Sequence, residues 1–464
     1  MKPFKILAIL LVMIGANCIA QDSLNYYIKV GINQNPQIKA KYNMYKASLE
    51  MVPQAASLPD PELSIGYFIT PKQELMGNQV ADIKLMQMFP WIGTLKAAKN
   101  EANSMASARQ MELYDEQNQL KLEISKKYYQ LYLINKEIAM VNNNLKIAET
   151  TLQLSLASYK TGGTVGVTSP EPEKTQKQQS SNQSGMSGNN AMQQSSEGMS
   201  NQGSGNNSSV MVAGKGMIDV LQAQMNIREL SNQLQSLKDK QQFQVAEFNL
   251  LLNRNEKELV TVQDTIEDFA LRVDSLSIAD SSVFNNSMAK MYSSERASLL
   301  AKAQKTKRMG YPMVGIGLDY MVLTPRQGNT EMDNGKDMVM PMLTITLPIY
   351  RKKYNAMQRE VGYTLNSTIE KQNALINNLK TSYYSTLQEI KDADRKIELY
   401  KWQIEVNRQT SEILIATYKS TGSGFEDVLK IQQKTIETQF KLIESIVEKL
   451  TAKANLEYLI SAQL

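Results

Sequence analysis

The sequence of 464 residues contains no histidine, and its single cysteine, Cys18, lies near the start. Histidine is the usual general base, cysteine is the usual thiol nucleophile, and both are common metal ligands, so these chemistries are missing. No glycine-rich phosphate loop follows a predicted strand, and no Gly-x-Ser-x-Gly sequence occurs. The carboxylates lie mainly on predicted helix faces, where they are solvated surface charge. We therefore predict that the chain is not an enzyme and has no cofactor.

Long apolar runs and an excess of one charge are also absent. No segment reaches the roughly 18 consecutive apolar residues of a transmembrane helix, so a membrane role would require β-strands. The formal net charge is only +5. Because acidic and basic residues are interleaved along the predicted helices, we expect no nucleic-acid partner.

The first residues have the pattern of a secretory signal peptide, which we place at residues 1–20. Lys2 and Lys5 form a basic start, an apolar run too short for a stable membrane anchor follows, and small residues lead to Ala20. Cleavage after Ala20 would remove the cysteine and exclude disulfides. Lipidation of Cys18 is the alternative, although the asparagine before it fits that poorly.

Four later segments alternate between apolar and polar residues with the period of two that indicates β-strands. Their apolar faces are Leu63, Ile65, Tyr67 and Ile69; Ala81, Ile83, Leu85 and Phe89; Val314, Ile316, Leu318, Tyr320 and Val322; and Leu343, Ile345 and Leu347. Each segment is about ten residues long, enough for a tilted strand to cross a bilayer. Proline and glycine place turns between the paired strands: Pro71 and Gly77, and then Pro325, Gly328, Asn329 and Gly335.

Four strands alone cannot close a barrel. An open sheet edge in hydrocarbon leaves unpaired backbone groups at several kcal/mol each, and the smallest single-chain barrels use about eight strands. We therefore expect three copies of the chain to pool twelve strands. A water-soluble sheet with one wet face is the alternative, but no amphipathic helix of matching length is available to cover the apolar face.

Long helices follow each strand pair, and the whole arrangement occurs twice. Pro61, Pro90 and Tyr159 mark the same points as Pro312, Pro348 and Tyr418, with 69 residues from Pro90 to Tyr159 and 70 from Pro348 to Tyr418. Helix-stop glycines follow in both copies, at Gly162-Gly163 and Gly422, and Asp219-Val220-Leu221 corresponds to Asp427-Val428-Leu429 in the returning helices. Asn35 and Pro36 predict the start of a shorter helix before the first strand pair.

The first long helix carries a coiled-coil seam, with apolar residues three and four apart. The seam residues are Leu131, Ile134, Ile138, Val141, Leu145, Ala148, Leu152, Ser155 and Tyr159, and the second copy has Ile390, Ala393, Ile397, Tyr400, Ile404, Leu414 and Tyr418. Asn407 and Ser411 interrupt the second seam. Such polar residues either fix the register of the helices or mark a seam that opens.

The first copy has 51 residues more than the second, mostly Ser, Gln, Asn and Gly between about 165 and 214. This composition cannot bury enough apolar surface to offset chain entropy, so we predict a disordered insert at the tip of the helical hairpin. Spaced methionines in or beside it (Met186, Met192, Met199, Met211 and Met217) raise the alternative of Cu(I) or Ag(I) binding. Methionine is common throughout the chain, however, and the absence of histidine disfavours a broad divalent-metal site.

The ordered, duplicated set of motifs resembles the TolC-like outer-membrane efflux proteins. It comprises Met88-Phe89-Pro90-Trp91-Ile92-Gly93, the counterpart Leu347-Pro348-Ile349-Tyr350, the tyrosine-then-glycine turns and the Asp-Val-Leu return helices. The resemblance covers the whole mature chain except the insert. It implies a mainly α-helical protein with a membrane β-barrel portion, built from two tandem repeats of a strand pair plus a long coiled-coil hairpin.

The resemblance also implies a homotrimer with twelve strands in the outer-membrane lipid and an α-helical tunnel in the periplasm. The trimer would be a passive exit channel of a tripartite efflux pump or type I secretion system. Its partners would be a periplasmic adaptor protein and an inner-membrane transporter. The alternative from another class is a periplasmic adaptor or coiled-coil scaffold protein without a pore.

Candidate gate residues come from the same resemblance. Asp427 matches the first aspartate of an acidic ring at the tunnel entrance, but Lys430 replaces the second. Tyr418 and Asp219 match a tyrosine–aspartate latch between the copies, and Ser423 replaces a nearby latch arginine. The alternative is that both aspartates are ordinary acids near helix N-termini. Phe89, Pro90, Trp91 and Pro348 would mark the junction between barrel and helices.

We accordingly expect a first repeat at 21–252, a linker of mixed short structure at 253–282 and a second repeat at 283–464. The exported cargo is not encoded in any of these motifs.

Overall fold

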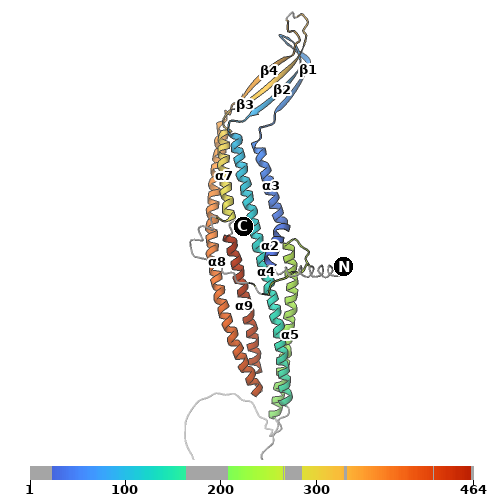
Figure 1. The fold of residues 1–464 in the computed structure, drawn as a ribbon, viewed down its shortest axis with the longest axis vertical. Coiled ribbons are helices and arrows are strands. Elements are labelled where there is room, and N and C mark those ends of the chain that lie inside the picture. Colours follow the sequence, from blue (N-terminus) through green and yellow to red (C-terminus); the bar gives the residue numbers. More distant parts are fainter. Residues whose placement is uncertain are drawn as a thin grey trace, which may run out of the picture. The chain divides into compact units, whose positions relative to one another are not determined.

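A computed structural model of the chain describes residues 23–162, 207–264, 266, 285–328, 332–421 and 423–460. The signal peptide, Cys18, most of the insert and residues 267–282 of the linker lie outside the described residues. The elements are α2 (Ser23–Gln34), α3 (Pro36–Ala56), β1 (Glu62–Glu74), β2 (Gly77–Phe89), α4 (Thr94–Gly162), α5 (Asn207–Leu251), α7 (Ser287–Arg308), β3 (Met313–Thr324), β4 (Met338–Thr346), α8 (Arg351–Thr421) and α9 (Phe425–Ile460) (Figure 1).

The predicted order of elements, a helix, two strands and two long helices, is confirmed in both halves. Asn35 is the N-cap of α3, as predicted, because its side-chain oxygen accepts from the backbone N–H of Gln37 at 2.8 Å and Pro36 begins the helix. Asn286 caps α7 in the same way, accepting from the backbone N–H of Met288 at 2.9 Å. None of the described helices contains a stretch long and apolar enough to cross a membrane.

The described residues form two compact units, and each unit takes segments from both halves of the sequence. The sheet unit comprises the described parts of 1–134, 241–397 and 444–464. The helical unit comprises the described parts of 135–240 and 398–443. The two compact units therefore do not coincide with the two sequence repeats.

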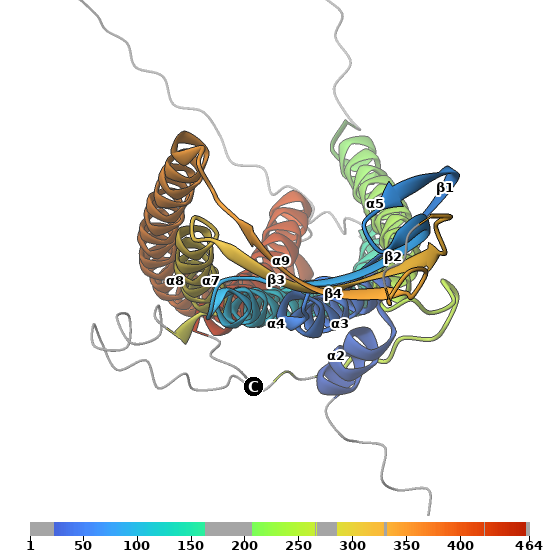
Figure 2. The same cartoon turned by 90° about the horizontal axis from the view of Figure 1, so that it is seen from above.

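In the sheet unit the four strands form one antiparallel sheet in the order β1-β2-β3-β4, a single thin layer when seen from above (Figure 2). The register places Leu63, Leu85, Leu318 and Pro341 in one lateral row. Since side chains alternate between faces along each strand, this row fixes the two faces of the whole sheet. The two faces match those predicted from the alternation, except that Leu347 follows the end of β4 at Thr346 and so is not part of the strand.

The first hairpin is tighter than predicted. We expected Pro71 in the loop, but β1 continues to Glu74 and β2 starts at Gly77. The ladder is irregular between Tyr67 and Lys72, where Pro71 lies. Proline is tolerated there because β1 is an edge strand and an irregularity leaves backbone groups unpaired. Gly77 has a φ of +142°, a conformation that favours glycine in this short turn.

The core of the sheet unit joins α2, α4 and the end of α5 to the described start of the linker. Tyr27, Ile124, Tyr128 and Phe248 are among its buried residues. The start of the linker, residues 253–264, contains turns and irregular structure.

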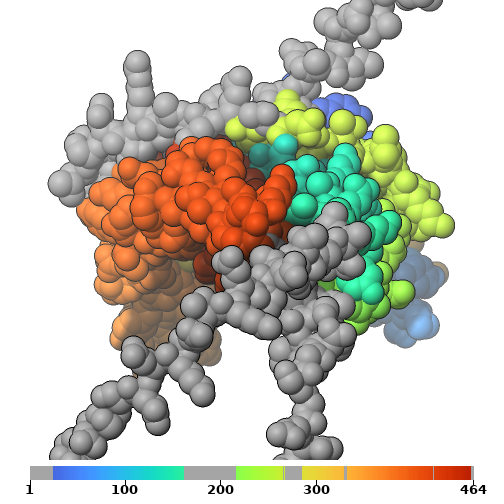
Figure 3. All heavy atoms as spheres, turned by 90° about the horizontal axis from the view of Figure 1, so that it is seen from below, coloured from blue at the N-terminus to red at the C-terminus, as the bar shows by residue number. Residues whose placement is uncertain are grey.

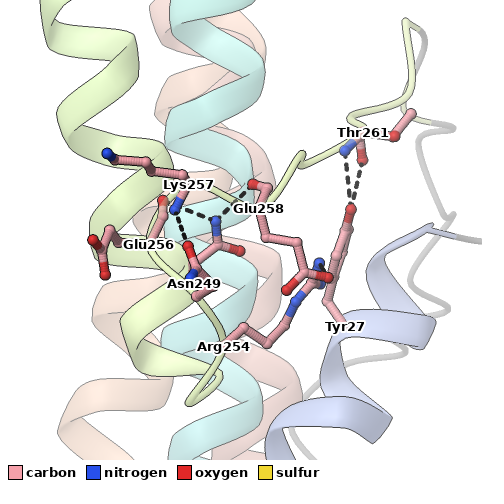
Figure 4. Close-up of polar contacts among 8 residues, drawn as sticks. Tyr27, Asn249, Arg254, Glu256, Lys257, Glu258 and Thr261 are labelled. Atoms are coloured by element: carbon pink, nitrogen blue, oxygen red, sulfur yellow. Dashed lines mark hydrogen bonds and ion pairs between the residues drawn. The ribbon is translucent and has the colours of Figure 1, made fainter.

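Polar contacts attach this linker segment to the core (Figure 4). The fully buried Asn249 donates its amide to the carbonyl oxygens of Glu258 at 2.8 Å and Glu256 at 3.3 Å. The hydroxyl of Tyr27 accepts from the backbone N–H of Thr261 at 2.9 Å. Single polar side chains therefore hold a segment that has no regular secondary structure.

In the helical unit the predicted seam of α4 faces α5. Val141, Ala148 and Leu230 form a buried cluster with partly buried apolar neighbours. Tyr159 is an exception to the predicted seam, since it is 41% exposed near the end of α4. Asn407, one of the two polar residues of the second seam, approaches Thr438 of α9 at 3.5 Å.

The boundary predicted for the insert is wrong at its C-terminal end. We expected irregular chain to about residue 214, but α5 already begins at Asn207. The sequence here starts with Asn and Ser, which suit a helix N-terminus, and continues into the apolar run Val210-Met211-Val212-Ala213.

Candidate functional site

One face of the sheet is apolar and exposed. The side chains of Ile65 and Leu343 are each 69% exposed, and Ile69 is 93% exposed. The apolar face continues across all four strands through Leu63, Tyr67, Ile83, Leu85, Ile316, Leu318, Val339 and Ile345, all more than one-third exposed. In Figure 1 no described helix of the sheet unit lies against this face. An apolar surface of this extent is unusual for a water-exposed sheet.

The opposite face is polar. Lys84 lies between two carboxylates, with its Nζ 2.8 Å from Asp82 Oδ2 and 3.7 Å from Asp319 Oδ2. Asp319 is only 1% exposed, and its Oδ1 has no hydrogen-bond partner. Gly66, at the same level, leaves room for Asp82, because an added Cβ would meet the carboxylate of Asp82. Buried charges of this kind need a polar or hydrated environment on their side of the sheet.

Both edges of the sheet are open. β1 pairs only with β2, and β4 pairs only with β3. Each edge therefore presents a row of backbone N–H and C=O groups without strand partners in the described chain.

The predicted junction residues lie where the strands meet the helices of the sheet unit. Phe89 ends β2, and Trp91 stacks on Tyr311 with ring centroids 5.2 Å apart. Pro90 lies between them, and Pro348 lies between β4 and α8. The surrounding apolar and aromatic side chains are strongly exposed: Ile92, Leu347, Ile349 and Tyr350.

Basic residues accompany this junction. The guanidinium group of Arg308 lies over Gly93, which has a φ of +84° and no side chain in the way. Arg351 donates to the carbonyl oxygen of Gly310 at 3.1 Å. Sequence reasoning missed Tyr311 and Arg308. The available signal was their place at the end of α7, directly before Pro312 and β3. We name Trp91, Ile92, Arg308, Tyr311, Leu347, Ile349, Tyr350 and Arg351 the junction belt.

At the other candidate site, in the helical unit, the structure brings Tyr418 and Asp219 together. The Tyr418 hydroxyl donates to Asp219 Oδ2 at 3.2 Å, although the residues are 199 positions apart. Tyr418 is 2% exposed and packs against Phe425, with ring centroids 5.3 Å apart. Burial raises the pKa of the Tyr418 hydroxyl, a hydrogen bond with Ser158 lowers it, and the Asp219 carboxylate raises it. The hydroxyl therefore stays protonated and donates.

Asp427 and Lys430, the other gate candidates, lie at the start of α9. Both are exposed, and Lys430 forms an ion pair with Glu426 at 2.8 Å. The lysine thereby lowers the pKa of the Glu426 carboxyl. Sequence reasoning missed Glu426, which the spacing of four residues to Lys430 on a helix could have indicated. Ser423 is hydrogen-bonded locally to the hydroxyl of Thr421, through its backbone N–H at 3.3 Å and its side-chain hydroxyl at 3.1 Å.

These residues belong to the ends of four helices. Figure 3 shows this end of the helical unit from below, with α8 and α9 in orange and red and α4 and α5 in teal and green. Within the described part of the chain, no three His, Cys, Asp or Glu side chains gather into a group that could hold a metal ion.

Comparison of the fold with solved structures identifies outer-membrane channels. The outer-membrane channel OprN has a TM-score of 0.69 and 12% identity, with 95% of this chain and 90% of that chain covered. The outer membrane protein VceC of Vibrio cholerae has a TM-score of 0.66 and 13% identity, with 95% and 96% covered. CusC, studied for its transmembrane channel formation, has a TM-score of 0.70 and 11% identity, with 96% and 93% covered.

No family model matches the chain, and no curated protein matches its sequence. At these identities the comparison establishes a shared fold. The mainly helical, TolC-like architecture predicted from the sequence motifs is therefore confirmed at the level of the fold.

Proposed function

We propose that three copies of this chain form a passive exit channel in the outer membrane, with the sheet in the lipid and the long helices forming a tunnel in the periplasm. The observation that carries the proposal is the exposed apolar face of a four-stranded sheet whose two edges are open. The resemblance to TolC-like proteins and the fold shared with outer-membrane channels support it.

The apolar face and the edges lead to the same arrangement. Lipid would cover the exposed Ile, Leu, Val and Tyr side chains, and the face with Asp82, Lys84 and Asp319 would line an aqueous pore. The backbone groups of β1 and β4 would each cost several kcal/mol if left unpaired in lipid. Pairing β4 of one copy with β1 of the next satisfies them, and three copies close twelve strands.

The junction belt fits one boundary of such a membrane. Trp and Tyr are enriched where lipid meets water, because their rings are apolar and their N–H or O–H groups need a polar neighbour. Trp91, Tyr311 and Tyr350 supply the rings, while Arg308 and Arg351 supply cations that interact with anionic head groups.

At the entrance, the hydrogen bond between Tyr418 and Asp219 would hold the closed state. It links α8 to α5, which belong to different repeats, so opening requires its loss. Asp427 would line the opening, and the ion pair of Lys430 with Glu426 would weaken the acidic ring of the family. The channel itself supplies no energy and no catalysis. Cargo would come from an inner-membrane transporter through a periplasmic adaptor.

Engineered disulfides test the pooled barrel. Cysteine at Ser64 on β1, combined with cysteine at Met340, Met342 or Thr344 on β4, places two thiols on the same face of opposite edges. We expect at least one pair to give covalent trimers after oxidation of outer membranes. The matched control is Ser64 with Lys84, which are partners within one sheet and should link only within a chain. The proposal fails if all three edge pairs leave monomers.

A further inference from the structure

The methionines of the sheet all lie on one face. β2, β3 and β4 contain Met86, Met88, Met313, Met321, Met338, Met340 and Met342. By the register, every one is on the polar face, with Lys84 and Asp319, and the apolar face of the described strands has none. A methionine that merely filled space would occur on either face. Its confinement to the polar face indicates that the thioether itself has a role there.

Two glycines gather three of these side chains. Met86 and Met88 on β2 have Gly317 and Gly315 as their partners on β3, and Met342 on β4 has Gly317 on its other side. Because β3 has no side chain at these two positions, methionines from both neighbouring strands extend over it.

The distances show how close the thioethers come. A Cβ placed on Gly315 would lie 2.5 Å from Met88 Sδ and 3.6 Å from Met86 Sδ, so the two sulfurs are at most 6.1 Å apart, the sum of those distances. A Cβ on Gly317 would lie 3.5 Å from the Cε atoms of both Met86 and Met342, so these two methyl groups are at most 7.0 Å apart, twice that distance. All three side chains are flexible, and rotations about their side-chain bonds would be needed to bring the three sulfurs onto one ion.

The surrounding charge favours a cation. Asp82 and Asp319 lie on the same face, with Lys84 as the single opposing charge of their cluster, and Asp319 Oδ1 has no hydrogen-bond partner. In the register Asp319 is the partner of Met340, and Asp82 is the partner of Met321. The buried carboxylates of Asp82 and Asp319 therefore attract a cation toward the neighbouring thioether sulfurs, which are soft ligands.

We propose that Met86, Met88 and Met342 form a binding site for a soft monovalent cation, Cu(I) or Ag(I). Thioethers select soft ions, whereas Mg²⁺ or Ca²⁺ would need clusters of oxygen ligands. This goes beyond the proposed function, since a passive channel needs no ligand site in its wall. The site depends only on the geometry of the sheet, so it can fail while the channel stands.

Oxidation footprinting of the wild-type protein tests the site. Purified full-length protein in detergent is treated with hydrogen peroxide, with and without excess silver nitrate in chloride-free buffer, and sulfoxide at each methionine is measured by peptide mass spectrometry. Bound Ag(I) should slow oxidation of Met86, Met88 and Met342 about tenfold or more. Met51 and Met225, exposed on α3 and α5, should be unaffected. Equal oxidation of the three site methionines with and without silver overturns the proposal.

Substitution gives an independent measurement. The triple variant Met86→Leu, Met88→Leu and Met342→Leu keeps side-chain volume and should bind one Ag(I) fewer per chain, measured by elemental analysis after gel filtration. In the matched control variant, leucine replaces three methionines that are exposed on helices: Met44, Met51 and Met225. This control should bind as many Ag(I) ions per chain as wild type. If the triple variant binds as many Ag(I) ions as wild type, the proposed site is wrong. The channel is tested separately, by the disulfide-linked trimers described above.

Discussion

Replacing Tyr418 with phenylalanine removes a single hydroxyl from the proposed latch. That hydroxyl donates to Asp219 at 3.2 Å, while the ring keeps its contact with Phe425. A hydrogen bond to a charged group contributes about 1.5–3 kcal/mol. Because Asp219 is only half-buried, water replaces part of that interaction, and we expect the lower end of the range. About 1.4 kcal/mol corresponds to a roughly tenfold change in an equilibrium constant.

The variant should therefore open more often. In planar bilayers, the ratio of time in the high-conductance state to time in the low-conductance state should rise roughly tenfold for Tyr418→Phe. Asp219→Asn should give a smaller rise, because the amide oxygen still accepts a hydrogen bond but carries no charge.

Tyr383→Phe is the matched control. Tyr383 is 3% exposed, and its hydroxyl is buried without a hydrogen-bond partner. Its removal should leave the conductance ratio unchanged and should not destabilise the protein. If Tyr418→Phe behaves like Tyr383→Phe, the hydrogen bond does not hold the channel closed, and the latch is wrong.

Three further substitutions test the packing and polar contacts of the sheet unit. Asn249→Ala should lower the free energy of unfolding by about 1–3 kcal/mol in denaturant titrations, because it removes two hydrogen bonds from the buried amide to the carbonyl oxygens of Glu256 and Glu258; an unchanged free energy of unfolding would show that other contacts hold the linker. Gly93→Ala should lower the free energy of unfolding by at least about 1 kcal/mol, because the φ of Gly93 is positive and the Arg308 side chain occupies the space of the added methyl group. An unchanged denaturation midpoint would contradict that strain. Burial raises the pKa of the Asp115 carboxyl above its ordinary 3.8. The folded state then binds more protons than the unfolded state, so stability should fall as pH rises above 3.8. In thermal melts at a series of pH values, Asp115→Asn should lose less stability with rising pH than wild type. If the two proteins show the same dependence of stability on pH, Asp115 is not its source.

The regular elements could be predicted because their signals are periodic. Alternation along Leu63, Ile65 and Tyr67 fixed a strand and its apolar face, and apolar residues three and four apart fixed the seam of α4. The duplication placed the second copy of each element. Pro71 was misplaced because an irregular edge strand tolerates a proline that would interrupt a central strand.

Contacts between single residues of distant segments have no such period. Nothing in the chain near Trp91 indicates that it stacks on Tyr311, or that Asn249 holds the carbonyl oxygens of residues 256 and 258 (Figure 4). The proximity of Tyr418 and Asp219 could be predicted only through the family resemblance. The shared face of the methionines becomes visible only when the register of all four strands is known.

Tryptophan quenching by brominated lipid tests most directly whether the apolar face meets lipid. Trp91 and Trp402, the only native tryptophans, are replaced with phenylalanine, and one new tryptophan is introduced at Ile65 or at its neighbour Ser64. The two positions share a strand and differ only in face. In reconstituted vesicles, fluorescence from position 65 should be strongly quenched and fluorescence from position 64 should not. Equal quenching at both positions, or none at position 65, would contradict the membrane channel.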